Sequence, residues 1–207
     1  MHLRCSVSTR STLMLLLATA AFGQAISGSP ADAFQVRYAS NLNIGDSVIN
    51  ITNAGTKNTA TGALSNICVN VYTFAPDEQL VSCCACNVTP NALVSLSARS
   101  DLISNTLTPA VPNSIVVKLV ASAQATCNAA TVTAEALAPG MRAWGTTLHA
   151  ALPAGSYAVT ETPFETAGLS AAELARMTSF CGFIQANGSG FGICRSCRSG
   201  GQGAVRQ

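Results

Sequence analysis

The chain has 207 residues, of which only 10% are charged, against about 25% in an average globular protein. Its formal net charge is +2, and its basic residues form no cluster beyond the C-terminal Arg195, Arg198 and Arg206. This composition argues against nucleic acid as a partner, because nucleic-acid-binding surfaces concentrate Lys and Arg.

The N-terminus has the three parts of a secretory signal peptide. Arg4 and Arg10 supply positive charge, an apolar run covers 13–22, and small residues follow up to Gly23 or Ala25. The apolar run is about half as long as a membrane-spanning helix. We therefore predict that residues 1–23 are a signal peptide, cleaved near Gly23 or Ala25. The mature chain should be extracellular or periplasmic, with no membrane span.

Loss of this segment also changes the charge balance. Arg4 and Arg10 leave with it and every acidic residue lies downstream, so 9 basic residues remain against 9 acidic ones. Proteins of low net charge associate readily, which favours self-association of the mature chain. We predict a single domain at 35–197, preceded by a loose segment at 24–34 and followed by a flexible tail at 198–207.

Short runs of β-forming residues, separated by Gly, Pro, Asn and Asp, predict a mainly antiparallel, β-sandwich-like fold. The first runs are 46–52 and 66–74, and a third is 114–121. The run at 66–74 is apolar on both faces, which predicts that it is covered on both sides. Its faces carry Ile67, Val69 and Val71, and Cys68, Tyr72 and Phe74, respectively.

The segments Val48–Thr52 and Ile67–Thr73 contain no lysine or proline. Soluble β-proteins commonly protect exposed strand edges with such residues, so either segment at an edge would be a natural surface for pairing with a second copy. A central strand needs no protection, and the sequence leaves both possibilities open.

A β-hairpin is predicted where the runs 143–152 and 156–162 flank Pro153-Ala154-Gly155. The alternation of large apolar residues suggests which side is buried. The candidates for the buried side are Trp144, Leu148 and Leu152, with Tyr157 and Val159 packed against them.

The phrase LPAGSYAVTET in this hairpin resembles the last hairpin of Cna-B-type stalk domains of bacterial surface proteins. Those domains use a glutamate to promote a Lys-to-Asn isopeptide bond, and the resemblance places Glu161 at that position. The resemblance covers this phrase alone, and a helix is predicted after it instead of a closing strand. We interpret the resemblance as a sequence pattern common to β-hairpins in general.

One clear helix is predicted at 170–186. Ser170 and Glu173 form a capping box, and Asn187-Gly188 supplies a stop. Its apolar stripe consists of Leu174, Met177, Cys181 and Ile184. A second, short helix is possible at 91–103, where Leu93, Leu96 and Leu102 would face the sheet, although its serines lower helix propensity.

Removal of Cys5 leaves 8 of the 9 cysteines, an even number that predicts four disulfides in an exported protein. Adjacent cysteines are poorly placed to bond to each other, so Cys83 and Cys84 should have different partners. Cys181 should tie the helix to the sheet. The disulfide candidates are Cys68, Cys83, Cys84, Cys86, Cys127, Cys181, Cys194 and Cys197.

An alternative interpretation uses the pairs Cys83-x-x-Cys86 and Cys194-x-x-Cys197 as a four-thiolate zinc site, or one such pair as a redox centre. The pairs lie far apart, Cys84 interrupts the first, and exported thiols are usually oxidised before they meet metal. Disulfides are therefore the favoured interpretation.

Residues for catalysis are sparse. His149 is the only histidine after the signal peptide, and it lies within a predicted strand. Asp77 and Glu78 are adjacent acids in a predicted turn. The glycine-rich 188–192 follows a helix instead of opening one, so it is unlike a phosphate-binding loop. We therefore expect no enzyme activity and no cofactor.

The leading functional hypothesis is a non-catalytic secreted structural or surface-interaction protein whose partners are itself or other extracellular proteins. A secreted ligand- or glycan-binding module is the first alternative, and it requires an exposed aromatic cluster. An extracellular thiol redox or zinc-binding protein is the second.

Overall fold

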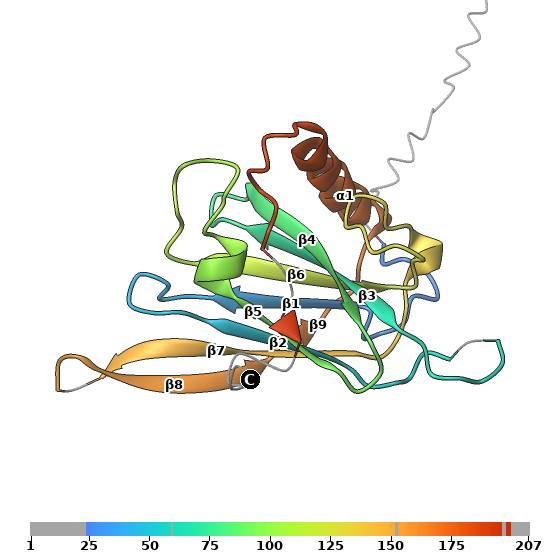
Figure 1. Cartoon of the computed structure of the whole chain (residues 1–207), viewed down its shortest axis with the longest axis horizontal. Helices are drawn as coiled ribbons and strands as arrows, with labels where there is room; N and C mark the ends of the chain where they lie inside the picture. Colours follow the sequence, from blue (N-terminus) through green and yellow to red (C-terminus); the bar gives the residue numbers. More distant parts are fainter. Residues whose placement is uncertain (1–23, 59, 152, 196–197, 200–207) are drawn as a thin grey trace, which may run out of the picture.

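Two antiparallel sheets packed face to face form the body of the molecule, shown as a computed structural model in Figure 1. The structure describes residues 24–58, 60–151, 153–195 and 198–199. The predicted signal peptide with Cys5, and also Cys197, lie outside the described residues. A helix lies on the outer face of the first sheet, so the molecule has three layers. The predicted mainly antiparallel, disulfide-bonded sandwich-like fold is confirmed.

Each sheet has five strands. The first contains, in spatial order, β4 (Leu80–Val88), β3 (Ile67–Phe74), β6 (Ile115–Ser122), β1 (Phe34–Ala39) and β9 (Glu165–Thr166). The second contains β10 (Arg198–Ser199), β5 (Leu93–Ser97), β2 (Val48–Asn53), β7 (Met141–Ala151) and β8 (Ser156–Pro163). The helical elements are the π-helical turn η1 (Ala98–Leu102), the 3-10 turn η2 (Ala134–Ala136) and the helix α1 (Ala171–Ala186).

Strand β3 is buried on both faces, as its sequence predicts. Val69 and Val71 point into the cluster between the sheets, where they join Ile51 of β2. Tyr72 and Phe74 point to the other side, into the cluster beneath α1. A strand between two apolar layers needs apolar residues at consecutive positions, which explains its unbroken pattern.

Helix α1 matches its prediction closely. The Ser170 hydroxyl caps it by accepting a hydrogen bond from the Glu173 N–H at 3.1 Å. The Glu173 carboxylate bonds to Lys118 Nζ of β6 at 2.5 Å instead of completing the capping box. The buried residues of the helix are those of the predicted stripe, Leu174, Met177, Cys181 and Ile184. The stripe packs on the outer face of the first sheet.

The second predicted helix is different in the structure. Residues 93–97 form strand β5, and only the turn η1 that follows is helical. Val94 and Leu96 pair with Ile51 and Ile49 of β2, and all four side chains enter the inter-sheet core. Because core-facing residues alternate along this segment, it forms a strand and not a helix. The Ser97 hydroxyl caps the turn η1 by accepting a hydrogen bond from the Ser100 N–H at 2.8 Å.

The two strands considered as open edges are central. Strand β2 lies between β5 and β7, and β3 lies between β4 and β6. The hypothesis that Val48–Thr52 or Ile67–Thr73 pairs with a second copy is therefore wrong. Because both of their backbone edges are already paired, these strands need no protecting lysine or proline.

The described parts of the two segments predicted to be loose contact the domain, and residues 200–207 of the predicted tail lie outside the described residues. Ala25 bridges Ser170, and the Ile26 N–H donates to the Leu169 carbonyl at 2.7 Å. At the other end, β10 pairs with β5. Within the described ranges, no helix has the length and apolar character needed to cross a membrane.

Candidate functional site

The disulfides fasten a loop, helix α1 and the C-terminal segment to the first sheet. The bonds are Cys68–Cys127, Cys83–Cys181 and Cys84–Cys194. The adjacent Cys83 and Cys84 have different partners, and Cys181 ties α1 to β4, as predicted. Cys86 is also disulfide-bonded, while Cys197 lies outside the described residues.

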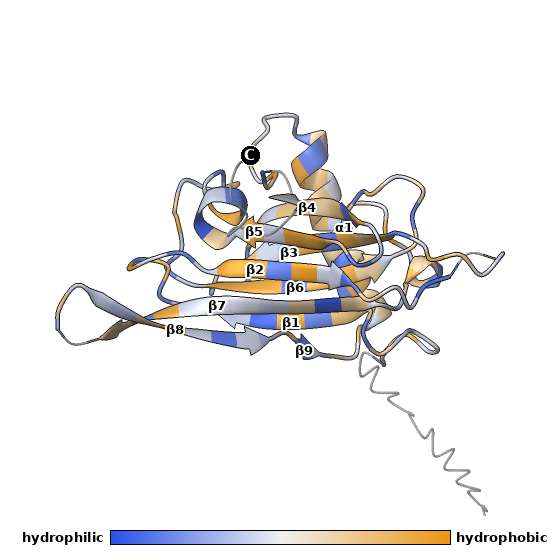
Figure 2. Ribbon diagram, turned by 60° about the horizontal axis from the view of Figure 1, so that its bottom comes forward, coloured by the Kyte–Doolittle hydropathy of each residue, from blue (hydrophilic) through white to orange (hydrophobic). Residues whose placement is uncertain are grey.

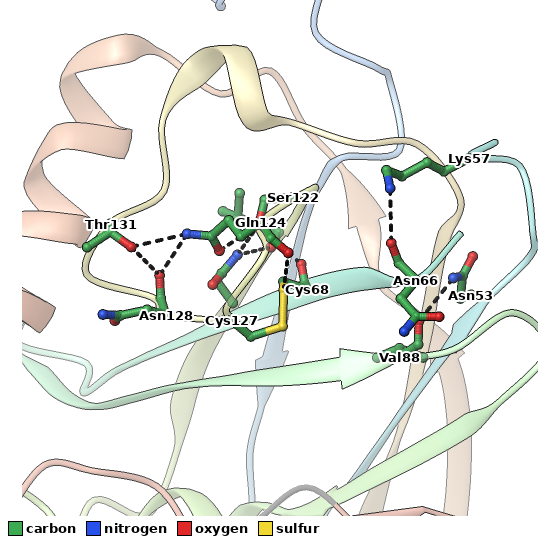
Figure 3. Close-up of a disulfide and its surroundings, with 12 residues drawn as sticks. Asn53, Lys57, Asn66, Cys68, Val88, Ser122, Gln124, Cys127, Asn128 and Thr131 are labelled. Atoms are coloured by element: carbon green, nitrogen blue, oxygen red, sulfur yellow. Dashed lines mark hydrogen bonds between the residues drawn. A yellow bond between two sulfur atoms is a disulfide. The ribbon is translucent and has the colours of Figure 1, made fainter. Parts of the chain in front are cut away.

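The Cys68–Cys127 bond fastens a long loop to β3 near the start of that strand (Figure 3). Gln124 organises this loop: its side-chain oxygen accepts from Ser122 Oγ at 2.9 Å, and its amide donates to the Asn128 carbonyl at 3.2 Å. The bond and its surrounding polar network are structural, since they hold the loop over the sheet.

The alternative zinc set Cys83, Cys86, Cys194 and Cys197 is not assembled. Cys83 and Cys194 bond to Cys181 and Cys84 instead, so neither offers a thiolate. Among the described residues, no group of three or more His, Cys, Asp or Glu side chains gathers as a metal site.

The residues considered for catalysis lie apart from one another. His149 is exposed on β7, with its Nε2 2.9 Å from Thr160 Oγ1 of β8. Asp77 and Glu78 occupy the turn between β3 and β4. Glu161, the position given by the stalk-domain resemblance, is exposed opposite Thr146. Lys118 pairs with Glu173 and lies on β6 of the first sheet, whereas Glu161 lies on β8 of the second sheet.

The β7–β8 hairpin is the most prominent surface feature, because its tip projects beyond the rest of the sandwich (Figures 1 and 2). The strands pair from Trp144 opposite Pro163 to Ala151 opposite Ser156. Gly155 closes the turn with a φ of +93°, a conformation that glycine adopts without steric cost. The predicted hairpin is confirmed.

Its buried face is the reverse of the predicted one. The inward residues of β7 are Met141, Ala143, Gly145 and Thr147. Trp144 and Leu148 lie on the outer face and are half-buried, whereas Tyr157 and Val159 are 50% and 61% exposed. Leu152 lies outside the described residues. The hairpin therefore presents an apolar stripe to its surroundings.

Arg37 anchors the root of this hairpin and was not identified from the sequence. Its buried side chain leaves β1 and crosses to the second sheet, where Nη2 donates to the Gly145 carbonyl at 3.0 Å and to Thr147 Oγ1 at 2.8 Å. Nε donates to Thr162 Oγ1 at 3.3 Å. Burial lowers the pKa of the guanidinium. The only sequence signal is one arginine within an otherwise strand-like run.

Neither of the ion pairs Lys118–Glu173 and Arg142–Asp32 involves Arg37, whose described partners are carbonyl and hydroxyl oxygens. Neutral oxygens thus surround this buried charge. Burial of a guanidinium is costly unless its donors are satisfied, so the geometry of β7 and β8 around Arg37 is closely specified.

Strand β8 is the outer strand of its sheet, with β7 on one side and no described strand on the other. The outer strand β4 is different, because the C-terminal segment covers it: the Cys83 N–H donates to the Gly192 carbonyl at 2.8 Å. The outer strands β9 and β10 have only 2 residues each. Among the described strands, β8 is therefore the long one with an open backbone edge.

A second surface lies on α1. Phe180 and Phe183 are exposed, and with Leu80 and Leu107 they line a hollow of about 210 Å³. The guanidinium of Arg176 lies between the rings of Phe74 and Phe180, at 5.6 and 5.7 Å from their centres. This is the kind of exposed aromatic group that a binding module requires.

These features define a disulfide-bonded β-sandwich with one packed helix, an open outer strand and an exposed aromatic group. No known protein family, no curated protein and no solved structure matches the chain. The geometry of the described residues therefore carries the functional argument.

Proposed function

We propose that this protein is an exported, non-catalytic structural protein that associates with copies of itself. The observation that carries the proposal is the open edge of β8, with Tyr157 and Val159 exposed beside it on a projecting hairpin. Exposed strands without lysine or another protecting feature are the usual sites of sheet extension. Strand β8 contains no lysine, its one charged residue is Glu161, and its proline lies at its last residue.

The charge and the disulfides support the same proposal. A chain left neutral by signal-peptide removal has little electrostatic repulsion between its copies. The bonds Cys83–Cys181 and Cys84–Cys194 join segments 98 and 110 residues apart, and such cross-links suit a product that must persist in an oxidising space outside the cytoplasm.

The test is the mass of the exported protein, produced from the full-length sequence. Light scattering or sedimentation near neutral pH, over the concentration range that solubility allows, should give a mass above that of the monomer. A constant monomeric mass over this range contradicts the proposal.

A ligand-binding module is the second candidate, favoured by the exposed Phe180 and Phe183 beside Leu80 and Leu107. Titration with an apolar fluorescent dye, or a survey of glycans, tests this surface. Binding that is lost in Phe183→Ser and retained in Val159→Lys supports this candidate, and unchanged binding in Phe183→Ser contradicts it.

A further inference from the structure

Resting on this proposed self-association, we infer that two copies join through antiparallel pairing of their β8 strands, with Val159 opposite Val159 on a two-fold axis. The two second sheets then become one continuous sheet.

The backbone N–H and C=O groups of successive β8 residues point alternately toward β7 and toward the open edge. The Phe164 N–H donates to the Ala143 carbonyl of β7 at 2.9 Å, just beyond the end of the strand. In an antiparallel pair the residues that face the partner recur at every second position, so Thr162, Thr160 and Ala158 also turn their backbone groups toward β7. Tyr157, Val159 and Glu161 turn their N–H and C=O groups outward.

Hydrogen bonds on the far side of β7 give the same alternation. The carbonyls of Thr146 and Leu148 accept from Ser47 Oγ and Asn41 Nδ2, which lie on the side of β7 away from β8. The residues that alternate with them along the strand, Gly145 and Thr147, therefore face β8. This agreement fixes which backbone groups of β8 remain for a partner strand.

The side chains next to these groups are apolar. Leu148 lies opposite Val159, and Ala150 lies opposite Tyr157, so these residues share the outer face of the hairpin. Val159 and Tyr157 are the exposed members. A partner β8 would place its own Val159 and Tyr157 beside them and would extend the apolar stripe across the interface.

Charge and Pro163 argue against an axis at Glu161 and are compatible with an axis at Val159. Glu161 is the only charged residue of β8, and like charges directly opposite each other destabilise a strand pair. With Val159 on the axis, Glu161 faces the partner's Tyr157, and every outward N–H meets a carbonyl. An axis at Glu161 would oppose two carboxylates and would place Pro163, which has no N–H, opposite Val159.

The occupant inferred from this pattern is a second copy of the chain. An antiparallel pair of identical strands is self-complementary and closes on itself as a dimer. The hairpin also projects from the body of the molecule, so two copies can approach without contact between their sandwiches (Figure 2).

The first experiment uses lysine at the centre of the edge. Val159→Lys should halve the mass measured by light scattering, because two lysines would face each other on the axis. Ser156→Lys, at the end of the strand and with its backbone turned toward β7, is the matched control and should retain the dimer. The melting temperature of both variants reports that the fold is intact.

The second experiment is cross-linking. A directly opposed, hydrogen-bonded pair has its Cα atoms about 5.5 Å apart, which suits a disulfide. Val159→Cys should therefore give a covalent dimer under oxidising conditions. The control Val111→Cys, whose native side chain is 63% exposed and lies outside the hairpin, should stay monomeric on a non-reducing gel.

The outcomes separate the inference from the proposed function. A monomeric wild-type protein contradicts both. A wild-type oligomer that persists in Val159→Lys, or a Val159→Cys variant that cross-links no faster than Val111→Cys, overturns the β8 pairing and leaves self-association through another surface.

Discussion

The guanidinium of Arg37 lies directly over Gly145, and only a glycine leaves room for it. A Cβ at residue 145 would lie 2.9 Å from Arg37 Cζ, while the Gly145 carbonyl accepts a hydrogen bond from Arg37 Nη2 at 3.0 Å. This contact joins β1 of the first sheet to β7 of the second.

The first prediction concerns this contact. Gly145→Ala should lower the free energy of unfolding by about 1 to 3 kcal/mol, because the added methyl group displaces a buried guanidinium. Urea unfolding with the disulfides intact measures the change.

The matched control is Gly182→Ala on α1. A Cβ there would meet Ala130 at an ordinary 3.8 Å, and alanine favours a helix over glycine by about 1 kcal/mol. This variant should be as stable as the wild type or more so. Equal stability changes in the two alanine variants would contradict the role assigned to Arg37.

The second prediction concerns alkaline pH. Tyr72 is fully buried, and its hydroxyl donates to the Ala129 carbonyl at 2.6 Å. Burial raises the pKa of this hydroxyl above its ordinary value of about 10. Above a pH of about 10 the unfolded chain loses this proton before the folded protein does. The free energy of unfolding should therefore be unaffected by Tyr72 ionisation below that pH and should fall as the pH rises above it.

Tyr72→Phe tests this assignment. The variant should lose about 1 kcal/mol at neutral pH with its hydrogen bond, and its stability should fall less steeply above pH 10 than that of the wild type. Chemical denaturation at several pH values measures both effects. Identical alkaline slopes would show that another group is responsible.

The third prediction concerns the disulfides. Replacing Cys83 and Cys181 together by alanine should lower stability by about 2 to 5 kcal/mol and should speed hydrogen exchange in α1, because this bond ties the helix to β4. Replacing Cys68 and Cys127 should instead loosen the loop around Gln124.

Peptide mapping provides the direct check on these bonds. It should recover Cys68–Cys127, Cys83–Cys181 and Cys84–Cys194 and should identify the partner of Cys86. Free thiols at these positions with bound zinc would reverse the structural interpretation.

The fourth prediction compares two lysine substitutions. Ile51 is fully buried in the central strand β2, so Ile51→Lys places a charge in the core and should prevent folding. Val159→Lys on the outer strand should still fold and unfold cooperatively, and its melting temperature should fall only by the amount that loss of the dimer accounts for. Thermal unfolding followed by circular dichroism distinguishes the two, and a stable Ile51→Lys variant would contradict the central placement of β2.

Local pattern was sufficient for the elements whose signals lie within their own residues. The Ser170 cap and the stripe at Leu174, Met177, Cys181 and Ile184 predict α1, and the unbroken apolar run predicts a doubly covered β3. Gly155 predicts the hairpin turn. In each case hydrogen bonding or burial repeats at the period of the element, so a single segment contains the information.

Neighbours in space decided the rest. Leu93 and Leu96 fit a helical spacing, but pairing with β2 turns Val94 and Leu96 into the core and makes β5 a strand. The sequence of one strand does not predict whether that strand is central or outer, because its neighbours come from distant parts of the chain. Only the strand order of the assembled sheets shows that β8 has the open backbone edge.

The β7–β8 hairpin shows most clearly what the sequence does not predict, namely which face is buried. Its large residues, Trp144 and Leu148, predict the buried side, but the inward face carries Ala143 and Gly145 instead. A glycine is needed at position 145 because Arg37 arrives from the opposite sheet and fills the space above it. Sequence alone thus determines that this segment forms a hairpin, whereas the packing of a distant side chain decides which face is covered and which remains for a partner.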